Sequence, residues 1–190
     1  NSVAEKEKSP SAPVGPVVST VLKVAPTNEV GRAAVPSEKL KQLVEEHGLR
    51  ATTDYDELRE ADAILIALPT PLSKQREPDL SIVRAATEEI ASRLRPGHLV
   101  VLESTTYPGT TRDEVLPILE RGSGLTAGID FHLAFSPERV DPGRIDHTTK
   151  TVPKVVGGIN EASTEAAAAL YGSAIDNVKP QLEVRSRRVG

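Results

Sequence analysis

Three apolar runs and a short fourth are separated by amphipathic segments along the middle of the chain. The runs cover residues 61–68, 98–103, 131–135 and 154–156. Continuous apolar stretches of this kind are typical of strands that are buried on both faces. Strands that alternate with helices predict βαβ units joined by right-handed crossovers. We therefore expect an α/β fold built on a doubly wound parallel sheet.

Four helices are expected before, between and after these strands, because apolar residues recur there at helical spacing. The first of them carries Leu40, Leu43 and Val44 on one face. The residues that we expect to cap or end the four helices are Ser37 and Gly48, Asp79 with Pro96 and Gly97, Thr110 with Asp113 as a T-x-x-D capping box, and Asn160 before an alanine-rich helix through Leu170.

The two ends of the chain differ from this regular pattern. Residues 1–16 mix Lys, Glu, Ser and Pro, which is the composition of a disordered arm. Residues 17–24 are rich in β-branched residues and could form one strand. We therefore divide the chain into a disordered or divergent arm (1–34), a regular domain (35–172) and a divergent tail (173–190). Because the chain begins with Asn, it could be a fragment or a processed product.

Composition and charge exclude several classes of protein. The 190 residues suffice for one α/β domain, and a net charge of −4 argues against a partner that is a nucleic acid. No apolar run is long enough to span a membrane, and no signal-peptide pattern is present, so a cytoplasmic location is expected. Cysteine is absent, which excludes disulfides, thiolate metal sites and a thiol nucleophile within this chain. The four histidines lack metal-ligand spacing, and we expect no metal.

Chemistry-bearing residues follow three of the expected strands, at the point where each strand ends. Pro69 and Thr70 follow the first, Thr105 lies in a run of three hydroxyl residues after the second, and Glu138 and Arg139 follow the third. In an open parallel sheet, ligands bind in the crevice beyond the carboxyl ends of the strands. The sequence therefore predicts one ligand site formed by three loops.

Each of these loops also has a simpler structural interpretation. The prolines are common at a strand exit, the hydroxyl residues can cap a helix, and the adjacent Glu and Arg can be a solvated pair. Similarly, His132 lies within an apolar strand and is interpreted as structural. Lys150 and Lys154 flank a strand start and are interpreted as solvated rather than catalytic.

Taken together, several strings resemble the NAD-binding domain of the UDP-glucose/GDP-mannose dehydrogenase family. They occur in order over residues 35–172 and read ATTDYDEL, PTPL, REPDL, LVVLESTTYPGTT, FSPERVDPG and PKVVGG. The resemblance implies that residues 35–172 are a partial, Rossmann-like domain with NAD as its cofactor. The ESTTYPGTT and SPERVDPG forms are most similar to the branch that oxidises UDP-N-acetylhexosamines.

The same resemblance implies roles for single residues. Family members oxidise the C6 alcohol of a UDP-sugar to a carboxylate in two NAD-dependent steps, through a thiol-bound intermediate, and are homo-oligomeric. By resemblance, Pro69, Thr70 and Thr105 would contact NAD, and Thr105 would also help to hold a catalytic water. Glu138 would transfer protons in the hydrolytic step, and Arg139 and Val140 would contact the nucleotide sugar.

Three parts of the family pattern are missing from this chain. It lacks the glycine-rich G-x-G-x-x-G turn of the usual first βα unit, the downstream catalytic cysteine, and the C-terminal sugar-binding domain. We therefore expect that this chain alone does not oxidise a nucleotide sugar and is a truncated or decayed piece of such an enzyme. One alternative is a non-catalytic α/β module that binds a nucleotide or a partner protein. Another is a 3-hydroxyacyl or 6-phosphogluconate type of dehydrogenase, which the quoted strings disfavour.

Overall fold

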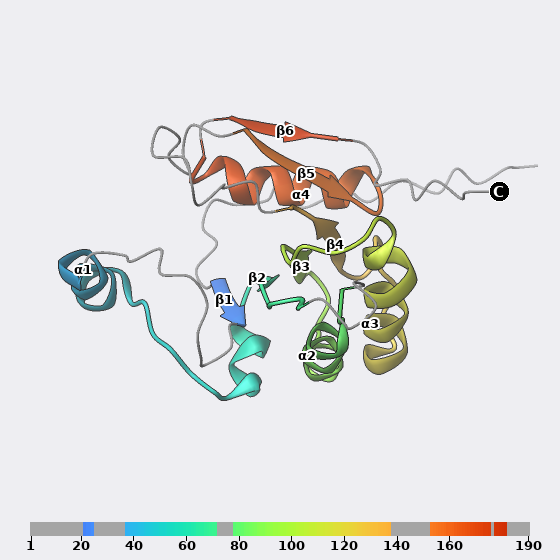
Figure 1. Ribbon diagram of the computed structural model, residues 1–190, viewed down its shortest axis with the longest axis horizontal. Helices are drawn as coiled ribbons and strands as arrows, with labels where there is room; N and C mark the ends of the chain where they lie inside the picture. Colours follow the sequence, from blue (N-terminus) through green and yellow to red (C-terminus); the bar gives the residue numbers. More distant parts are fainter. Residues whose placement is uncertain (1–20, 25–36, 72–77, 138–152, 176, 182–190) are drawn as a thin grey trace, which may run out of the picture.

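A six-stranded sheet organises the molecule, with its strands arranged in chain order from one edge to the other. The computed structural model describes residues 21–24, 37–71, 78–137, 153–175 and 177–181. The strands are β1 (Val21–Val24), β2 (Ala63–Ile66), β3 (Leu99–Leu102), β4 (His132–Phe135), β5 (Lys154–Gly158) and β6 (Val178–Pro180). In Figure 1 the sheet runs from β1, beside β2, to β5 and β6 at the top of the view.

The first four strands are parallel, whereas β5 reverses direction. Ala63 of β2 lies opposite Val21 of β1 on one side and opposite Leu99 of β3 on the other. β4 continues this parallel order, but β5 pairs with β4 in the antiparallel sense and β6 runs parallel to β5. The expected parallel sheet is thus confirmed for β1 to β4 and wrong for β5. The direction of a strand depends on the connection that precedes it. The short run at residues 154–156 does not indicate that direction.

Burial explains why the central strands form where they do. All four residues of β3 are buried, and Ile64 and Ile66 of β2 are fully buried. In a parallel sheet that helices cover on both faces, a continuous apolar strand buries its side chains on each face. The strand expected at residues 17–24 is confirmed over Val21–Val24, where it pairs with β2 and forms an edge of the described sheet. Residues 1–20 lie outside the described residues.

Helices cover both faces of the sheet and create two cores. The described helices are α1 (Ser37–His47), η1 (Tyr55–Glu60), α2 (Ser81–Ala91), η2 (Thr111–Val115), α3 (Leu116–Ser123) and α4 (Glu161–Gly172), of which all but α1 contribute to the cores. One core packs Val100 and Leu133 of the sheet against α2 and α3. The other packs Val101 and Val156 against α4. In Figure 1, α2 and α3 accordingly lie together on one side of β3, and α4 lies on the other.

Helix boundaries follow the expected caps at Gly48 and Asn160 and depart from them at both ends of α2. Gly48 follows α1 with a φ of 67°, as expected of a helix-ending glycine, and the Asn160 side chain accepts a hydrogen bond of 2.9 Å from the Ser163 amide at the start of α4. Asp79 accepts from the Ser81 amide at 2.9 Å, although Leu80 holds the N-cap position of α2. α2 ends at Ala91 rather than near Pro96, because the chain leaves it through tighter turns.

The expected capping box at Thr110 and Asp113 is wrong. The amides of Arg112 and Asp113 both donate to the carbonyl oxygen of Gly109, so the helical turn begins one residue earlier than the box requires. Thr110 therefore lies inside the turn with helical backbone angles, and its hydroxyl donates back to the carbonyl oxygen of Tyr107 at 2.7 Å. Gly109 has a φ of 97°, a conformation that favours glycine at this bend.

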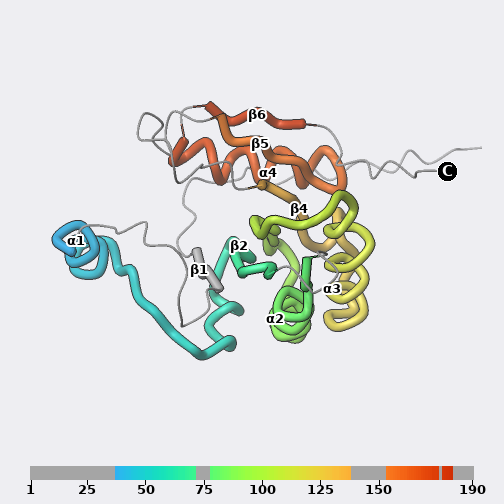
Figure 2. Tube along the Cα trace, viewed as in Figure 1, coloured from blue at the N-terminus to red at the C-terminus, as the bar shows by residue number. Residues whose placement is uncertain are grey.

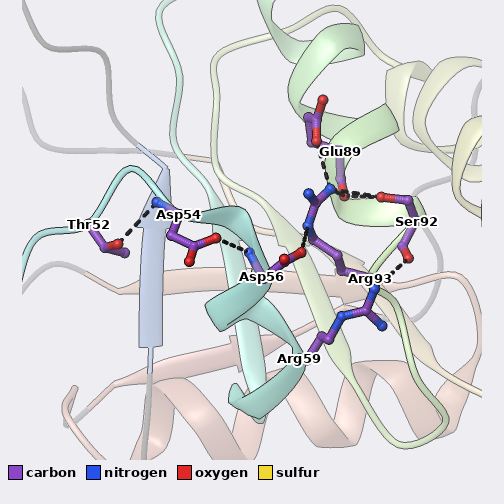
Figure 3. Close-up of polar contacts among 7 residues, drawn as sticks. All are labelled: Thr52, Asp54, Asp56, Arg59, Glu89, Ser92 and Arg93. Carbon is purple, nitrogen blue, oxygen red and sulfur yellow. Dashed lines mark hydrogen bonds and ion pairs between the residues drawn. The ribbon is translucent and has the colours of Figure 1, made fainter.

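The ATTDYDEL string has a structural role, which Figure 3 shows. Asp54 caps η1 by accepting from the amide of Asp56 at 2.9 Å. The guanidinium of Arg93 then donates to Asp56 at 2.7 Å and to Glu89 at 2.7 Å, and it lies 5.8 Å from the ring centre of Tyr55. These contacts join η1 to the end of α2, and the hydrogen bond to Asp56 raises the pKa of Arg93. The string therefore joins η1 to the end of α2 and lies away from the carboxyl ends of the strands.

Helix α1 stands apart from the rest of the described chain, as Figure 2 shows. None of its residues is buried, and Leu40 and Val44 of its apolar face are 46% and 50% exposed. The helical periodicity of this segment is confirmed, but its apolar face meets no described core. Among the described residues, no helix has both the length and the apolar character needed to cross a bilayer.

Candidate functional site

The carboxyl ends of β2 and β3 place two of the three predicted loops side by side. The chain leaves β2 through Leu68, Pro69 and Thr70, and it leaves β3 through Ser104 and Thr105. Because these two strands are parallel neighbours, both loops emerge at the same edge of the sheet. The structure therefore brings Pro69, Thr70 and Thr105 together, as the sequence predicts.

A side-chain hydrogen bond joins the two loops directly. The hydroxyl of Thr70 donates to the main-chain carbonyl oxygen of Thr105 at a distance of 2.6 Å. This bond uses the proton of the Thr70 hydroxyl and leaves its oxygen lone pairs available to a donor. The side chain of Thr105 is exposed, and its hydroxyl has no hydrogen-bond partner among the described residues. Both hydroxyls can thus reach a ligand that enters the crevice.

Ser104 joins the first residues of the two loops, a role that sequence reasoning missed. Its buried hydroxyl accepts a hydrogen bond of 2.8 Å from the Leu68 amide and donates to the carbonyl oxygen of Ile66 at 3.2 Å. The hydroxyl therefore continues the pairing of β2 and β3 past their last paired residues. In the sequence Ser104 is the first of three hydroxyl residues after an apolar run, and this position is the signal for a bridging role.

The far end of the loop after β3 is attached to α2. The hydroxyl of Tyr107 donates to the Glu114 carboxylate at 3.1 Å, and Arg84 of α2 donates to the same carboxylate at 2.9 Å. The hydrogen bond from Arg84 lowers the pKa of Glu114, and burial raises the pKa of Tyr107. This chain of contacts limits how far Thr105, two residues before Tyr107, can move from its position beside Thr70.

A buried ionic cluster lies directly before the same loop. The Nζ atom of Lys154 is 3.1 Å from Oε1 of Glu103, and the hydroxyl of Tyr171 donates to the same oxygen at 2.7 Å. The interpretation of Lys154 as solvated is therefore wrong, since the residue is only 9% exposed. Its partners come from the end of β3 and the end of α4, so no local pattern around Lys154 announces them. Lys150 lies outside the described residues.

The third predicted loop is described only at its two ends. Glu138, Arg139 and Val140 lie outside the described residues, so their proximity to Thr105 stays a prediction. The described ends are close together, because the buried hydroxyl of Ser136 donates to the carbonyl oxygen of Val155 at 2.9 Å. The segment that carries these three residues thus leaves the sheet and returns to it at one place.

A small pocket lies beside the crevice, between the start of η2 and the strands β4 and β5. Gly109, Arg112, Phe135 and Gly158 line it. Arg112 donates to the carbonyl oxygen of Ile159 at 2.9 Å, which fixes its guanidinium at the wall of the pocket. Gly158 is required there for close packing, because a Cβ atom at this position would meet the main-chain amide of Thr164 in α4. The PKVVGG string thus has a packing role next to the predicted site.

The histidine that the sequence places within a strand is His132, the first residue of β4. His132 is half-buried, burial lowers its pKa, and its Nδ1 atom has no partner in the part of the chain that the structure describes. Within those same residues, no group of three or more potential ligands could hold a metal ion.

Comparisons with known proteins place these features in one family. Residues 24–175 match the model of the "UDP-glucose/GDP-mannose dehydrogenase family, NAD binding domain". Protein CapL of Staphylococcus aureus is 41% identical over 149 residues, which cover 78% of this chain and 33% of CapL. UDP-N-acetyl-D-glucosamine 6-dehydrogenase of Pseudomonas aeruginosa is 35% identical over 130 residues, covering 68% of this chain and 31% of that enzyme. The chain therefore spans about a third of the length of these curated relatives.

Solved structures give the same picture. The crystal structure of NDP-N-acetyl-D-galactosaminuronic acid dehydrogenase from Methanosarcina mazei Go1 superposes with a TM-score of 0.72 and 38% identity, over 77% of this chain and 32% of that one. The ternary complex of GDP-mannose dehydrogenase from Pseudomonas aeruginosa superposes with a TM-score of 0.66 and 28% identity, over 74% of this chain and 34% of that one. The Rossmann-like α/β fold expected from the sequence is thereby confirmed.

Proposed function

Because the chain belongs to the UDP-glucose/GDP-mannose dehydrogenase family of NAD-dependent oxidoreductases, we propose that it forms the cofactor-binding part of a UDP-N-acetylhexosamine 6-dehydrogenase. Such an enzyme oxidises the C6 alcohol of the sugar to a carboxylate and reduces two molecules of NAD per sugar. Relatives named for UDP-N-acetyl-D-glucosamine and for UDP-N-acetyl-D-mannosamine support this class of substrate. The chain matches only about a third of the length of these relatives. The activity of a whole enzyme is therefore part of this proposal.

The observation that carries the proposal is the hydrogen bond between the loops after β2 and β3. It brings the Thr70 side chain to the main chain of Thr105, beyond the ends of β2 and β3, which supports a shared site for these two residues. Ligands of doubly wound sheets bind in the crevice beyond such strand ends. We propose that Pro69, Thr70 and Thr105 hold NAD there, with the two prolines around Thr70 keeping the loop extended as a wall for a flat ring.

The residues of this chain fit only part of a dinucleotide site. In the classic fingerprint, a glycine-rich turn after the first strand lets the pyrophosphate approach the backbone closely. Here β1 is followed by Ala25, Pro26 and Thr27, and the only glycine between residues 16 and 47 is Gly31. We therefore propose that the loops after β2 and β3 supply the contacts to NAD and that affinity is low in this chain by itself.

The remaining roles concern proton transfer and substrate contact. NAD, when bound, accepts the hydride that leaves C6. We propose that Glu138 removes a proton from the water that hydrolyses the second intermediate, and that the hydroxyl of Thr105 orients this water. Arg139 and Val140 contact the nucleotide sugar, since a guanidinium suits a phosphate group. The thiol that the family uses is not available, because this chain has no cysteine. We therefore propose that the chain alone completes no turnover.

Calorimetric titration of the purified chain with NAD tests this function. Saturable binding that weakens in Thr105→Val, but not in Thr53→Val, supports the proposed cofactor site, because Thr53 is exposed on the segment before η1. A second assay mixes the chain with NAD and UDP-N-acetyl-D-glucosamine and follows NADH absorbance. Formation of NADH would overturn the proposal that this chain alone is inactive.

The second candidate function is a non-catalytic module that binds a partner protein. The exposed apolar face of α1 and the missing glycine-rich turn favour it. Absence of any heat with NAD, from a chain whose circular dichroism shows it to be folded, would favour this candidate over the cofactor site. The cytoplasmic location and the homo-oligomeric state of longer family members stay predictions.

A further inference from the structure

The Glu103–Lys154–Tyr171 cluster lies immediately next to the proposed cofactor site but outside it. Oε1 of Glu103 is 3.1 Å from Lys154 Nζ and accepts from the Tyr171 hydroxyl at 2.7 Å. The Nζ atom also lies 5.0 Å from the centre of the Tyr171 ring, within the range of a cation–π contact. Two groups, from β5 and α4, thus converge on a single carboxylate oxygen at the end of β3.

The cluster is shielded from water. The side chains of Glu103 and Lys154 are 15% and 10% exposed, and Tyr171 is 7% exposed. An ion pair in such a place contributes little net stability, because removing both charges from water offsets most of their attraction. Replacing such a pair with apolar groups is often neutral for stability. Its presence at this point therefore calls for a role other than holding the fold together.

The position of Glu103 in the strand indicates that role. Val101 of β3 packs in the core under α4, whereas Leu102 packs in the opposite core under α2 and α3. Glu103 continues the face of Val101 and is held from the α4 side. The next residue, Ser104, is held from the opposite direction by its hydrogen bonds to β2. The backbone that leads into Thr105 is thus fixed from two sides.

We propose that the Glu103–Lys154–Tyr171 cluster positions Thr105 for the cofactor, with Glu103 as the positioning residue. The cluster does not touch the ligand. It holds the backbone directly after β3 so that the Thr105 carbonyl oxygen meets the Thr70 hydroxyl and the Thr105 side chain is available to the cofactor. The proposal rests on the proposed function for its link to NAD, but its geometric part concerns this chain alone.

The experiment separates positioning from stability by comparing a single with a double variant. Glu103→Leu leaves the Lys154 ammonium buried without its partner, so we expect a lower melting temperature. Glu103→Leu/Lys154→Leu removes both charges, so we expect a melting temperature near that of the natural chain. The matched control is Lys41→Leu/Glu45→Leu, which removes an exposed ion pair of the same kind in α1.

Two readouts are measured on each variant. One is the amide chemical shift of Thr105 in a ¹⁵N-labelled chain, and the other is the dissociation constant for NAD. In the double variant we expect the amide chemical shift of Thr105 to differ from that of the natural chain. We also expect NAD to bind more weakly by about fivefold or more, despite the recovered melting temperature. The control is expected to match the natural chain in both. Recovery of both the amide shift and the affinity together with the melting temperature would overturn the proposal.

A milder variant covers the case in which the leucine substitutions prevent folding. Tyr171→Phe keeps the ring and its packing but removes one hydrogen bond to Glu103. An amide chemical shift of Thr105 in this variant that equals the shift in the natural chain would also overturn the proposal. If the natural chain does not bind NAD, the proposed function fails for this chain, and the amide shifts alone decide whether the cluster positions Thr105.

Discussion

The hydroxyl of Thr70 donates to the carbonyl oxygen of Thr105, 35 positions further along the chain. This contact joins the two loops beyond the point where the Ser104 hydroxyl already bonds to the Leu68 amide. Because it lies beyond the carboxyl ends of β2 and β3, it couples the position of one loop to the position of the other. A ligand that contacts both loops meets them already assembled, which lowers the entropy lost on binding.

Thr70→Val should weaken the binding of NAD while leaving the fold intact. The substitution keeps the shape of the side chain but removes the donor, at a cost of about 1 kcal/mol or roughly fivefold in the dissociation constant. Calorimetric titration measures this change. Thr70→Ser retains the hydroxyl and is expected to bind as the natural chain does, and equal loss in both variants would contradict this role of the hydroxyl.

Ser104→Ala should destabilise the chain. The buried hydroxyl is the partner of the Leu68 amide, and without it this amide is left unsatisfied, which costs about 1–3 kcal/mol. Urea unfolding followed by circular dichroism measures the free energy of unfolding. Ser173→Ala removes an exposed hydroxyl at the end of α4 and should change that free energy by less than about 0.5 kcal/mol. Similar losses in the two variants would show that the Ser104 hydroxyl has no special role.

Gly158→Ala should destabilise the contact between β5 and α4. A Cβ atom at this position would come within 2.6 Å of Ser163 atoms, which is closer than real Cβ contacts allow. Overpacking of this kind costs about 1–3 kcal/mol. The control is Gly172→Ala at the end of the same helix, where a Cβ atom meets nothing within 4 Å. The changes in melting temperature of the two variants should differ in sign or size. An unchanged melting temperature in Gly158→Ala would refute the close approach of β5 to α4.

Acid should destabilise the chain partly through His98. This side chain is fully buried, and its burial, with the nearby positive charge of Arg95, lowers its pKa from 6.5 to about 4. Between these two values the unfolded chain binds a proton that the folded chain does not, so stability falls as the pH falls through this window. Below the folded pKa both states are protonated and His98 contributes no further change. The full effect amounts to about 3 kcal/mol.

Proton NMR of the His98 ring measures this pKa in the folded chain. The ring is the neutral tautomer with Nδ1 as acceptor, because Nδ1 accepts from the Arg95 amide at 3.2 Å. We expect no titration of His98 above about pH 5 in the folded chain, and titration near 6.5 in urea. In His98→Asn, the dependence of the unfolding free energy on pH between 6.5 and 4 should become shallower. A folded His98 that titrates near 6.5 would contradict the prediction.

The central strands and the loops that follow β2 and β3 could be predicted because local patterns determine them. Continuous apolar runs located β2, β3 and β4, and polar residues directly after them located Thr70 and Thr105. The helix caps were less reliable, since Thr110 and its neighbours can cap a helix or lie within it according to where the preceding glycine bends. The reversal of β5 had no local signal at all.

Lys154 shows why part of the site could not be predicted. A lysine beside a proline at a strand start is usually solvated, and the residues around it offer no acid within reach. Its acid is Glu103, 51 positions earlier in the chain, and this pairing exists only because β5 returns to the end of β3 and β4. Clusters assembled by strand order require the fold to be known before they can be recognised.

The bond between Ser136 and Val155 closes a segment of the chain upon itself. These residues are 19 positions apart, yet their atoms meet at 2.9 Å, and the proposed substrate-contacting residues Arg139 and Val140 lie in the enclosed segment. Because the cost of closing a loop grows only slowly with its length, such a segment can be lengthened, shortened or exchanged with little effect on the framework. Under the proposed function, the residues that contact the sugar could therefore vary within this segment while the paired strands β2 and β3 stay unchanged.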